Sequence, residues 1–446
     1  MYFKRHIDKE LHSWMVSKNR KPILLRGARQ IGKTASVVEL GKNFTSFLRI
    51  DFELSPKVYK IFEVDLSPQR ICEELSLFYS TPIIEGETLL FFDEIQQCIP
   101  AIQSLRYFYE KMPNLHLIAA GSLLEFALEN IASYGVGRIR SVFMYPMSFD
   151  EFLLAQNEDA LLKKKRASSP SSPISEVLHL KLTLYFKKFL VIGGMPEVVR
   201  TYINTRDFNQ CQLVLDDLVY SFQDDFAKYK KNISTSRLHE VFESVIQQTG
   251  HKFVFSKAAL QSNHKQIKEA LNLLIMAGLV IPVKHSSANG LPLGAESNPR
   301  KQKMMICDTG ILQRILQLEL NSMVLSDDFD TINKGNIAEL FVGLEMQKYQ
   351  SPYHRNELFY WHREAKNSNA EVDFLYTKNG DIFPVEIKSG KSGSMRSMYI
   401  FLEEKKRRKG FRLSLENFAT YDKVEVYPLY AVSSLTNIDV FLPINK

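Results

Sequence analysis

A glycine-containing segment near the start of the chain, GARQIGKT at positions 27–34, most constrains what this sequence can fold into. It follows a short apolar run at 23–25 and opens a segment with helical character. The glycines let backbone N–H groups curl around phosphate oxygens, and the start of a helix adds partial positive charge there. The pattern therefore predicts a phosphate-binding loop between a strand and a helix.

The side chains of this loop predict binding of ATP with Mg²⁺. Lys33 is expected to bridge the β- and γ-phosphates, and the Thr34 hydroxyl to complete the shell of a Mg²⁺ ion. Alone, the pattern also occurs as an ordinary loop, but the strand before it and the helix after it favour phosphate binding. The residues expected to surround the nucleotide phosphates are Gly27, Ala28, Arg29, Gln30, Ile31, Gly32, Lys33 and Thr34.

A second element is the apolar run at 89–92, which ends in Asp93 and Glu94. Asp93, at the C-terminal end of a predicted strand, is expected to hold the Mg²⁺ through water. Glu94 is the natural group to polarise the attacking water and is the candidate catalytic residue for ATP hydrolysis. Such a run alone is also typical of a buried strand leaving the core. Its place after a phosphate loop favours the catalytic interpretation.

Short apolar runs alternate with helical segments through the first part of the chain. Strands are predicted at 22–26, 47–52, 88–93 and 115–120, with helices between them. This alternation predicts an α/β fold with a parallel sheet covered on both faces. The length of 446 residues predicts roughly two to four domains, and 45% apolar with 24% charged residues excludes a disordered or fibrous chain.

Export and membrane insertion are not predicted. The N-terminal segment lacks the apolar region of a secretory signal, and the longest apolar stretch, 273–283, is too short to span a bilayer. The four cysteines lie far apart without the spacing of metal ligands, so neither a zinc site nor a disulfide framework is predicted. We expect a soluble, cytoplasmic protein.

The middle of the chain predicts helices followed by a winged-helix module. The basic, then Ser/Pro-rich stretch at 161–175 is expected to be an exposed loop, and helices are expected over 177–229 with a break at 193–196. Residues 233–283 predict three helices, the third capped by Asn263, and strands are predicted at 279–283 and 303–307.

Three helices followed by a two-stranded wing are typical of a DNA-binding winged helix. Packing of this module against the ATPase or another protein fits the pattern equally well. The polar residues that the third helix would expose to a DNA groove are Lys265, Gln266, Lys268 and Asn272.

A hairpin near the C-terminus is predicted by Asn379-Gly380 between two alternating runs, because this dipeptide favours a two-residue type I′ turn. The turn fixes the register, so that Asp373 faces Glu386 and Glu371 faces Lys388 on one side of the hairpin. The other side is predicted to be an unbroken apolar face formed by Val372, Phe374, Tyr376, Phe383, Val385 and Ile387.

The polar side of this hairpin predicts a metal-dependent site. Directly opposed carboxylates repel one another, and a Mg²⁺ or Mn²⁺ ion held by Asp373 and Glu386 reverses that repulsion. Lys388 is expected to stabilise a developing phosphorane or to orient the attacking water. Two alternatives stay open: a charged face on an exposed hairpin, and a fold kept for DNA binding without cleavage.

The segments GARQIGKT, LLFFDEIQ, HLIAAGSLLEF, YPMSFDEF and GGMPEVV together resemble a family of bacterial and archaeal AAA-type ATPases. In that family the ATPase domain is joined to a winged helix and a C-terminal restriction-endonuclease-like, PD-(D/E)XK domain. The resemblance implies that Ser122 senses the γ-phosphate and that Arg138 or Arg140 acts as an arginine finger. It also implies that Glu339 adds a metal-binding carboxylate to Asp373, Glu386 and Lys388.

We therefore expect an ATPase domain with a helical extension at 1–225, a winged helix at 226–310 and a restriction-endonuclease-like domain at 311–446. The predicted function is ATP-dependent action on DNA, with nucleotide state controlling a Mg²⁺-dependent nuclease-like site. The alternative is a nucleotide-dependent switch whose C-terminal domain binds DNA or a protein without cleavage. An arginine finger favours a homo-oligomer or a protein partner.

Positive charge gathers near the predicted nuclease-like face. Between positions 388 and 412, nine Lys or Arg residues stand against two Glu residues, a surplus as large as the net charge of +7 for the whole chain. Such a cluster is expected to neutralise phosphates of a DNA duplex. A solvated helix face with internal Glu–Lys pairs is the alternative.

Overall fold

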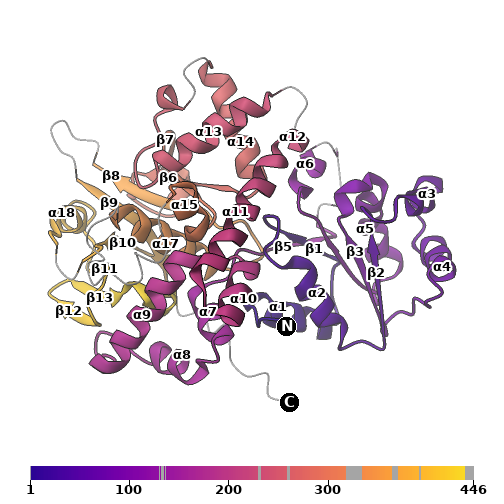
Figure 1. Ribbon diagram of the computed structural model, residues 1–446, viewed down its shortest axis with the longest axis horizontal. Helices are drawn as coiled ribbons and strands as arrows, with labels where there is room; N and C mark the ends of the chain where they lie inside the picture. Colours follow the sequence, from indigo (N-terminus) through magenta and orange to yellow (C-terminus); the bar gives the residue numbers. More distant parts are fainter. Residues whose placement is uncertain are drawn as a thin grey trace.

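The computed structural model describes residues 2–129, 131, 135, 137–229, 233–258, 262–317, 334–363, 370–390 and 393–436. Figure 1 shows a parallel sheet with its helices on one side of the molecule and a second sheet on the other, with a helical layer between them. None of the helices in the described residues combines the length and apolar character that a bilayer span requires.

The first sheet confirms the predicted α/β architecture. Its five strands run parallel in the order β2-β3-β4-β1-β5. The four predicted strands are present, and a fifth, β5, was not predicted because its four residues carry no strong strand pattern. The strands are β1 (Ile23–Arg26), β2 (Ser46–Asp51), β3 (Thr88–Asp93), β4 (His116–Ala120) and β5 (Arg140–Phe143).

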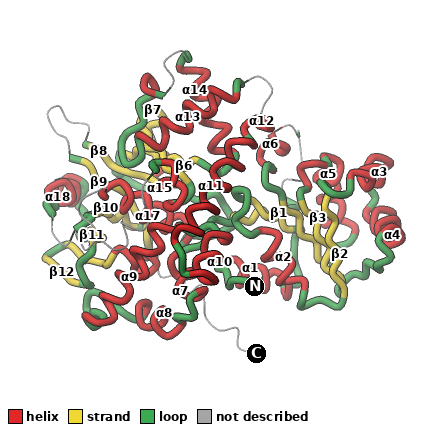
Figure 2. The backbone as a smooth tube through the Cα atoms, in the orientation of Figure 1, coloured by secondary structure: helices red, strands yellow, loops and turns green. Residues whose placement is uncertain are grey.

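Alternate side chains of these strands enter two apolar cores, one on each face of the sheet. Leu89 and Phe91 of β3 join the core under α1 and α2, whereas Leu90 and Phe92 join the core under α3, α4 and α5. Figure 2 shows these helices on opposite sides of the sheet. The helices and 3-10 turns are α1 (His6–Val16), α2 (Lys33–Gly41), η1 (Pro56–Val58), α3 (Tyr59–Val64), α4 (Pro68–Phe78), η2 (Ile95–Gln97), α5 (Ile99–Lys111) and α6 (Leu124–Glu129).

A helical layer follows the ATPase-like sheet. The predicted break at 193–196 is confirmed between α9 and α10, where Pro196 begins α10. Gly193 has φ of +73°, and a Cβ there would lie 2.0 Å from Asp308 Oδ1, so the break requires glycine. The helices are α7 (Phe149–Ala155), α8 (Asp159–Arg166), α9 (Glu176–Ile192), α10 (Pro196–Thr205), α11 (Phe208–Asp224) and α12 (Phe226–Tyr229).

The expected exposed loop at 161–175 is wrong over its first part, which forms α8. Leu161 and Leu162 are buried, and Lys165 is fully buried beside Asp150, with its Nζ 2.6 Å from Asp150 Oδ1. Composition alone predicts an exposed run here, because the counter-charge of Lys165 lies on another helix, α7.

The predicted order of helix, short helix, helix and two strands is confirmed as α13 (Thr235–Gln247), η3 (Phe255–Lys257), α14 (His264–Met276), β6 (Val280–Ser286) and β7 (Ser297–Ile306). Asn263 caps α14 by accepting the Gln266 N–H, and Gln266 accepts the Asn263 N–H in return. The Gln266 side chain is therefore engaged in the cap rather than free for a groove, while Lys265 and Lys268 are exposed.

The second sheet has eight strands in the order β12-β13-β11-β10-β9-β8-β6-β7. It crosses the predicted boundary at 310/311, because β6 pairs in parallel with β8. Its remaining elements are η4 (Leu293–Glu296), α15 (Thr309–Ile315), α17 (Lys334–Lys348), β8 (Leu358–His362), β9 (Glu371–Lys378), β10 (Asp381–Ile387), α18 (Arg396–Glu404), β11 (Gly410–Ser414), β12 (Ala419–Tyr421), β13 (Val424–Pro428), η5 (Leu429–Ala431) and α19 (Val432–Thr436).

The hairpin of β9 and β10 has the predicted register from Asp381–Lys378 to Val385–Phe374. The predicted unbroken apolar face is wrong at Val372, which packs with Trp361 and Leu375 instead of with Phe374. The cause is a shift of register between β8 and β9, which inserts one extra residue in β9 next to Asp373.

Candidate functional site

The phosphate loop has the backbone that its glycines predict. Gly27 and Gly32 have φ values of +142° and +95°, and Gln30 also lies in the left-handed region at +61°. A Cβ at Gly27 would lie 2.2 Å from the Met144 carbonyl oxygen, so a larger residue there would displace the segment after β5. The loop joins β1 to α2, which begins at Lys33.

Lys33 is buried beneath the loop. Its Nζ donates to the carbonyl oxygens of Gly27, at 2.9 Å, and Ala28, at 2.6 Å. An ammonium group has three N–H donors, so one remains for a phosphate oxygen. Burial lowers the pKa of Lys33 to about 8, while the nearby carboxylates Glu94 and Asp93 act against that decrease.

Asp93 and Thr34 meet next to the loop. The Thr34 hydroxyl donates to Asp93, at 3.0 Å from Oδ2 and 3.2 Å from Oδ1. Arg49 on β2 also contacts this carboxylate, with its Nε 2.9 Å from Asp93 Oδ2. Burial raises the pKa of Asp93, and the Arg49 charge opposes that rise. Arg49 was not predicted as a site residue, because its only sequence signal is a charge inside an apolar strand.

Glu94 turns toward Ser122 at the end of the neighbouring strand β4. The backbone of Glu94 is left-handed, with φ of +49°. Its Oε2 accepts from the Ser122 hydroxyl at 3.1 Å, from the Ser122 N–H at 3.3 Å and from Gln96 Nε2 at 2.6 Å. The structure therefore brings together Lys33, Thr34, Asp93, Glu94 and Ser122 at the carboxyl ends of β1, β3 and β4.

The two arginines expected as fingers have other partners. Arg138 forms an ion pair with Glu110 of α5 and is about half exposed, with 49% of its side chain accessible. Arg140 lies on β5, where its guanidinium stacks over Tyr353 at 5.5 Å. Among the described residues no hydrogen bond joins either arginine to the phosphate loop of the same chain.

Two later parts of the chain contact the phosphate loop. Arg29 forms an ion pair with Asp225, which follows α11 and is buried. Gly278, after α14, lies against Ala28, because a Cβ at Gly278 would be 3.2 Å from the Ala28 nitrogen. The loop is therefore in contact with both the helical layer and the predicted winged-helix module.

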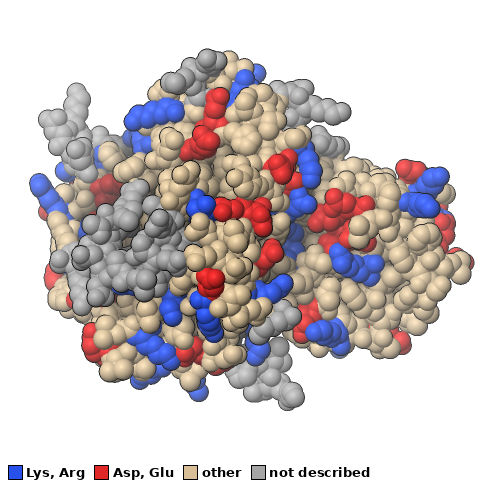
Figure 3. Space-filling model, in the orientation of Figure 1, with Lys and Arg blue, Asp and Glu red and all other residues tan. Residues whose placement is uncertain are grey.

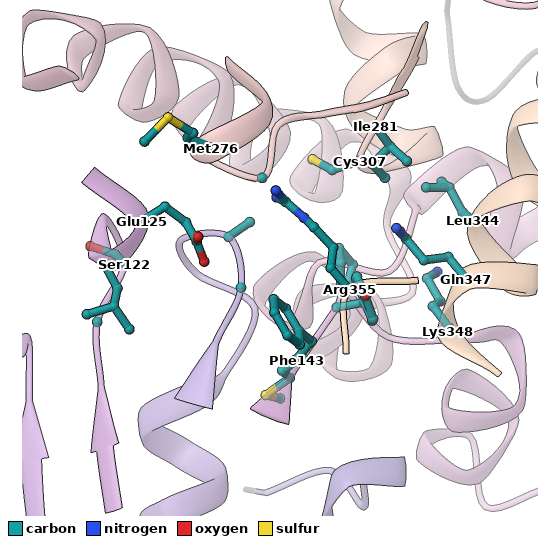
Figure 4. A pocket seen from close by; sticks show the side chains of 18 residues that line it. Ser122, Glu125, Phe143, Met276, Ile281, Cys307, Leu344, Gln347, Lys348 and Arg355 are labelled. Carbon is teal, nitrogen blue, oxygen red and sulfur yellow. The ribbon is translucent and has the colours of Figure 1, made fainter. Parts of the chain in front are cut away.

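A pocket of about 640 Å³ borders the phosphate loop at Gly27 and Ala28 (Figure 4). Ser122 and Glu125 line it from the segment that follows β4, Met276 and Cys307 from the middle of the chain, and Arg355 from the C-terminal part. The Arg355 side chain extends into the pocket and donates to the Ile275 carbonyl oxygen at 2.7 Å. Three parts of the chain thus meet next to the phosphate loop.

A second site lies on the eight-stranded sheet, where the predicted carboxylates converge. Asp373 Oδ2 accepts the Ile387 N–H at 2.7 Å, and Lys388 Nζ lies 2.7 Å from Glu386 Oε1. Glu386 is buried, and its Oε2 has no hydrogen-bond partner among the described residues. Burial and the Asp373 charge raise the pKa of Glu386 to about 7. An orphaned carboxylate oxygen beside a second carboxylate fits a divalent cation.

The β9–β10 register does not extend to the predicted Glu371–Lys388 position, and Glu371 forms an ion pair with Lys303 of β7. Lys303 Nζ lies 2.5 Å from Glu371 Oε1 and 2.9 Å from Glu339 Oε1. Burial raises the pKa of Glu339 to about 8, although the Lys303 charge acts against this rise. Sequence reasoning missed Lys303, which precedes an apolar run and carries no local signal of its partners.

The three carboxylates proposed as metal ligands differ in whether an oxygen is available to bind a metal. They belong to Asp373, Glu386 and Glu339. Glu339 is engaged by Lys303, whereas Glu386 keeps a free buried oxygen. Over the described ranges, no group of three or more His, Cys, Asp or Glu side chains has the arrangement of a metal site. Of the two glutamates, Glu386 is the one with a buried oxygen that has no hydrogen-bond partner among the described residues.

Four of the nine basic residues in the expected cluster at 388–412 form ion pairs. Lys388, Arg407, Lys409 and Arg412 pair with Glu386, Asp381, Glu425 and Glu416, respectively. Lys391 lies outside the described residues. On the face shown in Figure 3, described basic and acidic side chains are interspersed. A surplus counted along the sequence is thus partly offset by acids that lie outside the stretch.

Comparisons with known proteins bear on parts of the chain. An AAA domain model matches residues 19–153, and two further models, the domains of unknown function DUF8612 and DUF4143, match residues 183–322 and 334–437. No curated protein matches the sequence. Together with the loop geometry, the first match shows that the chain contains an AAA-type P-loop ATPase domain.

Solved structures show only distant likeness. A Walker-type ATPase of Pyrococcus abyssi has 14% identity and a TM-score of 0.46, covering 71% of this chain and 96% of that one. The Orc1 protein of Aeropyrum pernix in complex with DNA has 13% identity and a TM-score of 0.30, covering 73% and 94%. The ADP complex of Hsp104 from S. cerevisiae has 13% identity and a TM-score of 0.27, covering 61% and 38%.

Proposed function

We propose that this protein binds and hydrolyses ATP and acts on DNA through a C-terminal, restriction-endonuclease-like site, with nucleotide state controlling that site. The observation that carries the ATPase part is the convergence of Lys33, Thr34, Asp93 and Glu94 at the carboxyl ends of β1 and β3, which lie on either side of β4 in the parallel sheet. Ligands of such sheets bind at this edge.

Each residue of the ATPase site has a distinct role in this proposal. Backbone N–H groups of residues 27–34 surround the phosphates, and the remaining donor of Lys33 contacts a phosphate oxygen. Thr34 and Asp93 hold Mg²⁺, which neutralises phosphate charge when it is bound. Glu94 orients the attacking water, and Ser122, hydrogen-bonded to Glu94, reports on the γ-phosphate.

The arginine finger is proposed to act between subunits. Arg138 forms an ion pair with Glu110 and is half exposed, so its side chain is accessible to a neighbouring molecule. A guanidinium supplied in trans stabilises charge on the transferring phosphoryl group. We therefore propose a homo-oligomer or a complex with a partner ATPase.

The C-terminal part supports the nuclease-like proposal through Asp373, Glu386 and Lys388. Asp373 and Glu386 fit a Mg²⁺ or Mn²⁺ ion, which polarises a phosphodiester oxygen when it is bound. Lys388 stays next to Glu386 and places an ammonium group where charge develops on the phosphate. The proposed domains remain 1–225, 226–310 as a winged helix, and 311–446, although β6 and β7 extend the sheet of the last one.

A physical connection between the two sites supports control by nucleotide. Helix α17 carries Glu339 at the carboxylate cluster and, six residues later, Glu345 at the ATPase domain. Glu345 Oε2 accepts the Phe149 N–H of α7 at 3.0 Å, and Lys348 Nζ donates to the Met147 carbonyl at 2.9 Å. A rigid helix between both sites is able to transmit a displacement.

The second candidate function is a nucleotide-dependent switch that binds DNA or a protein without cleavage. It is favoured by the Lys303 ammonium, which engages Glu339 and Glu371 of the carboxylate cluster. With this positive charge inside the cluster, the site attracts a divalent cation less strongly than carboxylates alone would.

A cleavage assay separates the two functions. Linear, branched and supercoiled DNA would be incubated with Mg²⁺ or Mn²⁺, with and without ATP. Cleavage by the wild type and its loss in Asp373→Ala and Lys388→Ala supports the nuclease-like site. If the wild type leaves all these substrates intact, or if both variants cut as well as the wild type, the nuclease proposal is wrong and the switch is favoured.

A further inference from the structure

Lys303 stands out because it is buried inside the carboxylate cluster but belongs to a different part of the chain. It lies on β7, whereas Glu339 is on α17 and Glu371 on β9. Only 2% of its side chain is exposed. The ammonium contacts both carboxylates, at 2.9 and 2.5 Å, and lies 5.2 Å from the centre of the Tyr360 ring. A buried ammonium persists only with such partners.

The negative charges that act on Lys303 come from α17 and β9. Glu339 and Glu371 contact it directly, and Asp373 acts on it through space. Glu386 and Lys388 form a neighbouring pair, with their charged groups 2.7 Å apart. Four carboxylates thus face two ammonium groups, so each lysine compensates part of a repulsion that would otherwise require a bound cation.

The carboxylates of the cluster differ in whether their oxygens have hydrogen-bond or ion-pair partners. Glu339 and Glu371 each give an oxygen to Lys303. Glu386, which is only 6% exposed, keeps its Oε2 without a hydrogen-bond partner in the described part of the chain. An unpartnered carboxylate oxygen in a buried site is costly unless a ligand compensates it. The oxygen without a partner therefore belongs to Glu386, close enough to Asp373 for the two charges to interact.

We propose that Lys303 is a built-in counter-cation that keeps Glu339 out of metal coordination, so that a divalent cation is held by Asp373 and Glu386 alone. This inference rests on the proposed metal-dependent site and adds a residue from outside the C-terminal part. The strand β7 supplies the charge, so the site depends on the middle of the chain. Loss of Lys303 would free Glu339 as a further ligand and strengthen metal binding.

The test measures Mn²⁺ binding to the nucleotide-free, chelator-treated full chain by the electron paramagnetic resonance signal of free Mn²⁺. Lys303→Met is expected to bind Mn²⁺ about tenfold more tightly or better, the scale on which neighbours of ligands change metal affinity. Lys303→Arg keeps the charge and is expected to stay close to the wild type. The double variant Lys303→Met/Glu339→Gln is expected to lose the gain. An unchanged affinity in folded Lys303→Met overturns the proposal.

A second comparison does not depend on removing the buried lysine. In the wild-type background, Glu339→Gln is expected to leave Mn²⁺ affinity unchanged, whereas Asp373→Asn weakens it. If Glu339→Gln weakens binding as much as Asp373→Asn does, Glu339 is already a ligand and the counter-cation role is wrong. If Asp373→Asn has no effect either, the metal site of the proposed function is itself absent, which distinguishes the two failures.

Discussion

At the scale of single residues, the proposed ATPase site is a set of side chains that form hydrogen bonds with one another. Asp93 accepts hydrogen bonds from Thr34 and Arg49. Glu94 accepts one from the Ser122 hydroxyl. Lys33 is kept close to the loop by two backbone carbonyls. These contacts pre-position each group for its proposed partner, which reduces the reorganisation that binding would otherwise require.

Glu94→Gln is predicted to retain ATP binding but to lower the rate of hydrolysis by about 10²-fold or more, the usual contribution of a general base. Lys33→Ala is predicted to lose binding, because the bridging charge on the phosphates is removed. Nucleotide binding by fluorescence and steady-state turnover measure the two effects. Glu87→Gln, at an exposed position before β3, is the matched control and should behave as wild type. Binding and turnover retained in Lys33→Ala would refute the phosphate-loop assignment.

The site residues that the sequence did not predict share one property. Arg49 and Lys303 each lie within or beside an apolar strand and contact acids that are distant in the sequence, Asp93 in one case and Glu339 with Glu371 in the other. A lone basic residue carries no signal of its partner. Only pairing of the strands shows which acid it meets.

At the scale of elements, α8 shows how tertiary contacts override composition. Its basic run turns Lys165 inward to Asp150 of α7, and Lys165 also donates to the Ser433 hydroxyl at 2.7 Å. Burial acts to raise the pKa of Asp150, but the charges of Lys165 and Arg166 lower it to about 2. The YPMSFDEF segment therefore serves as a buried junction between elements, in which Ser148 caps α7.

Lys165→Met is predicted to lower the free energy of unfolding by about 3 kcal/mol, because it breaks a buried ion pair. This value is at the lower end of the range for such changes, since Arg166 still contacts Asp150 in the variant. The midpoint of urea unfolding, followed by circular dichroism, measures this loss. Lys164→Met on the exposed side of the same helix is the control and should leave the midpoint unchanged. Equal midpoints for the two variants would contradict the structural role of Lys165.

The β9–β10 hairpin shows how far along its strands the turn determines the register. The Asn379-Gly380 turn determines the register near the tip, as expected from a short connection. Farther from the turn, the extra residue of β9 beside Asp373 comes from pairing with β8. This irregularity ends the regular pairing just before Asp373 and Glu386 and leaves their side chains at an interrupted part of the sheet.

At the scale of the whole molecule, the proposed domains are joined by a shared β-sheet and by contacts between helices. The eight-stranded sheet includes β6 and β7 of the middle part, and α17 packs against α7 through buried polar contacts. Phe143 of β5 donates to the Pro352 carbonyl at 2.7 Å, which extends the ATPase sheet toward the C-terminal part. We therefore expect nucleotide-linked changes to move these parts together.

Arg138→Ala is predicted to lower ATP turnover by about 10³-fold if Arg138 acts in trans, the scale of an arginine finger. Mixing it with Glu94→Gln should restore activity that neither variant has alone, because an intact Arg138 then faces an intact Glu94 across the subunit boundary. Turnover of the mixed and separate variants measures this. Arg140→Ala is the parallel variant, and a failure of mixing to restore turnover would contradict an intersubunit finger.

The sequence by itself determined the local features: the phosphate loop, the apolar strand ending in Asp93 and Glu94, the cap of α14 and the register near the hairpin turn. Each depends on residues close together in the chain, so residue type and spacing suffice to predict it. Only the tertiary structure decided that Lys303 enters the carboxylate cluster, that Lys165 is buried and that β6 joins β8. These contacts join residues far apart in the sequence, and their energy depends on burial and counter-charges that exist only after folding.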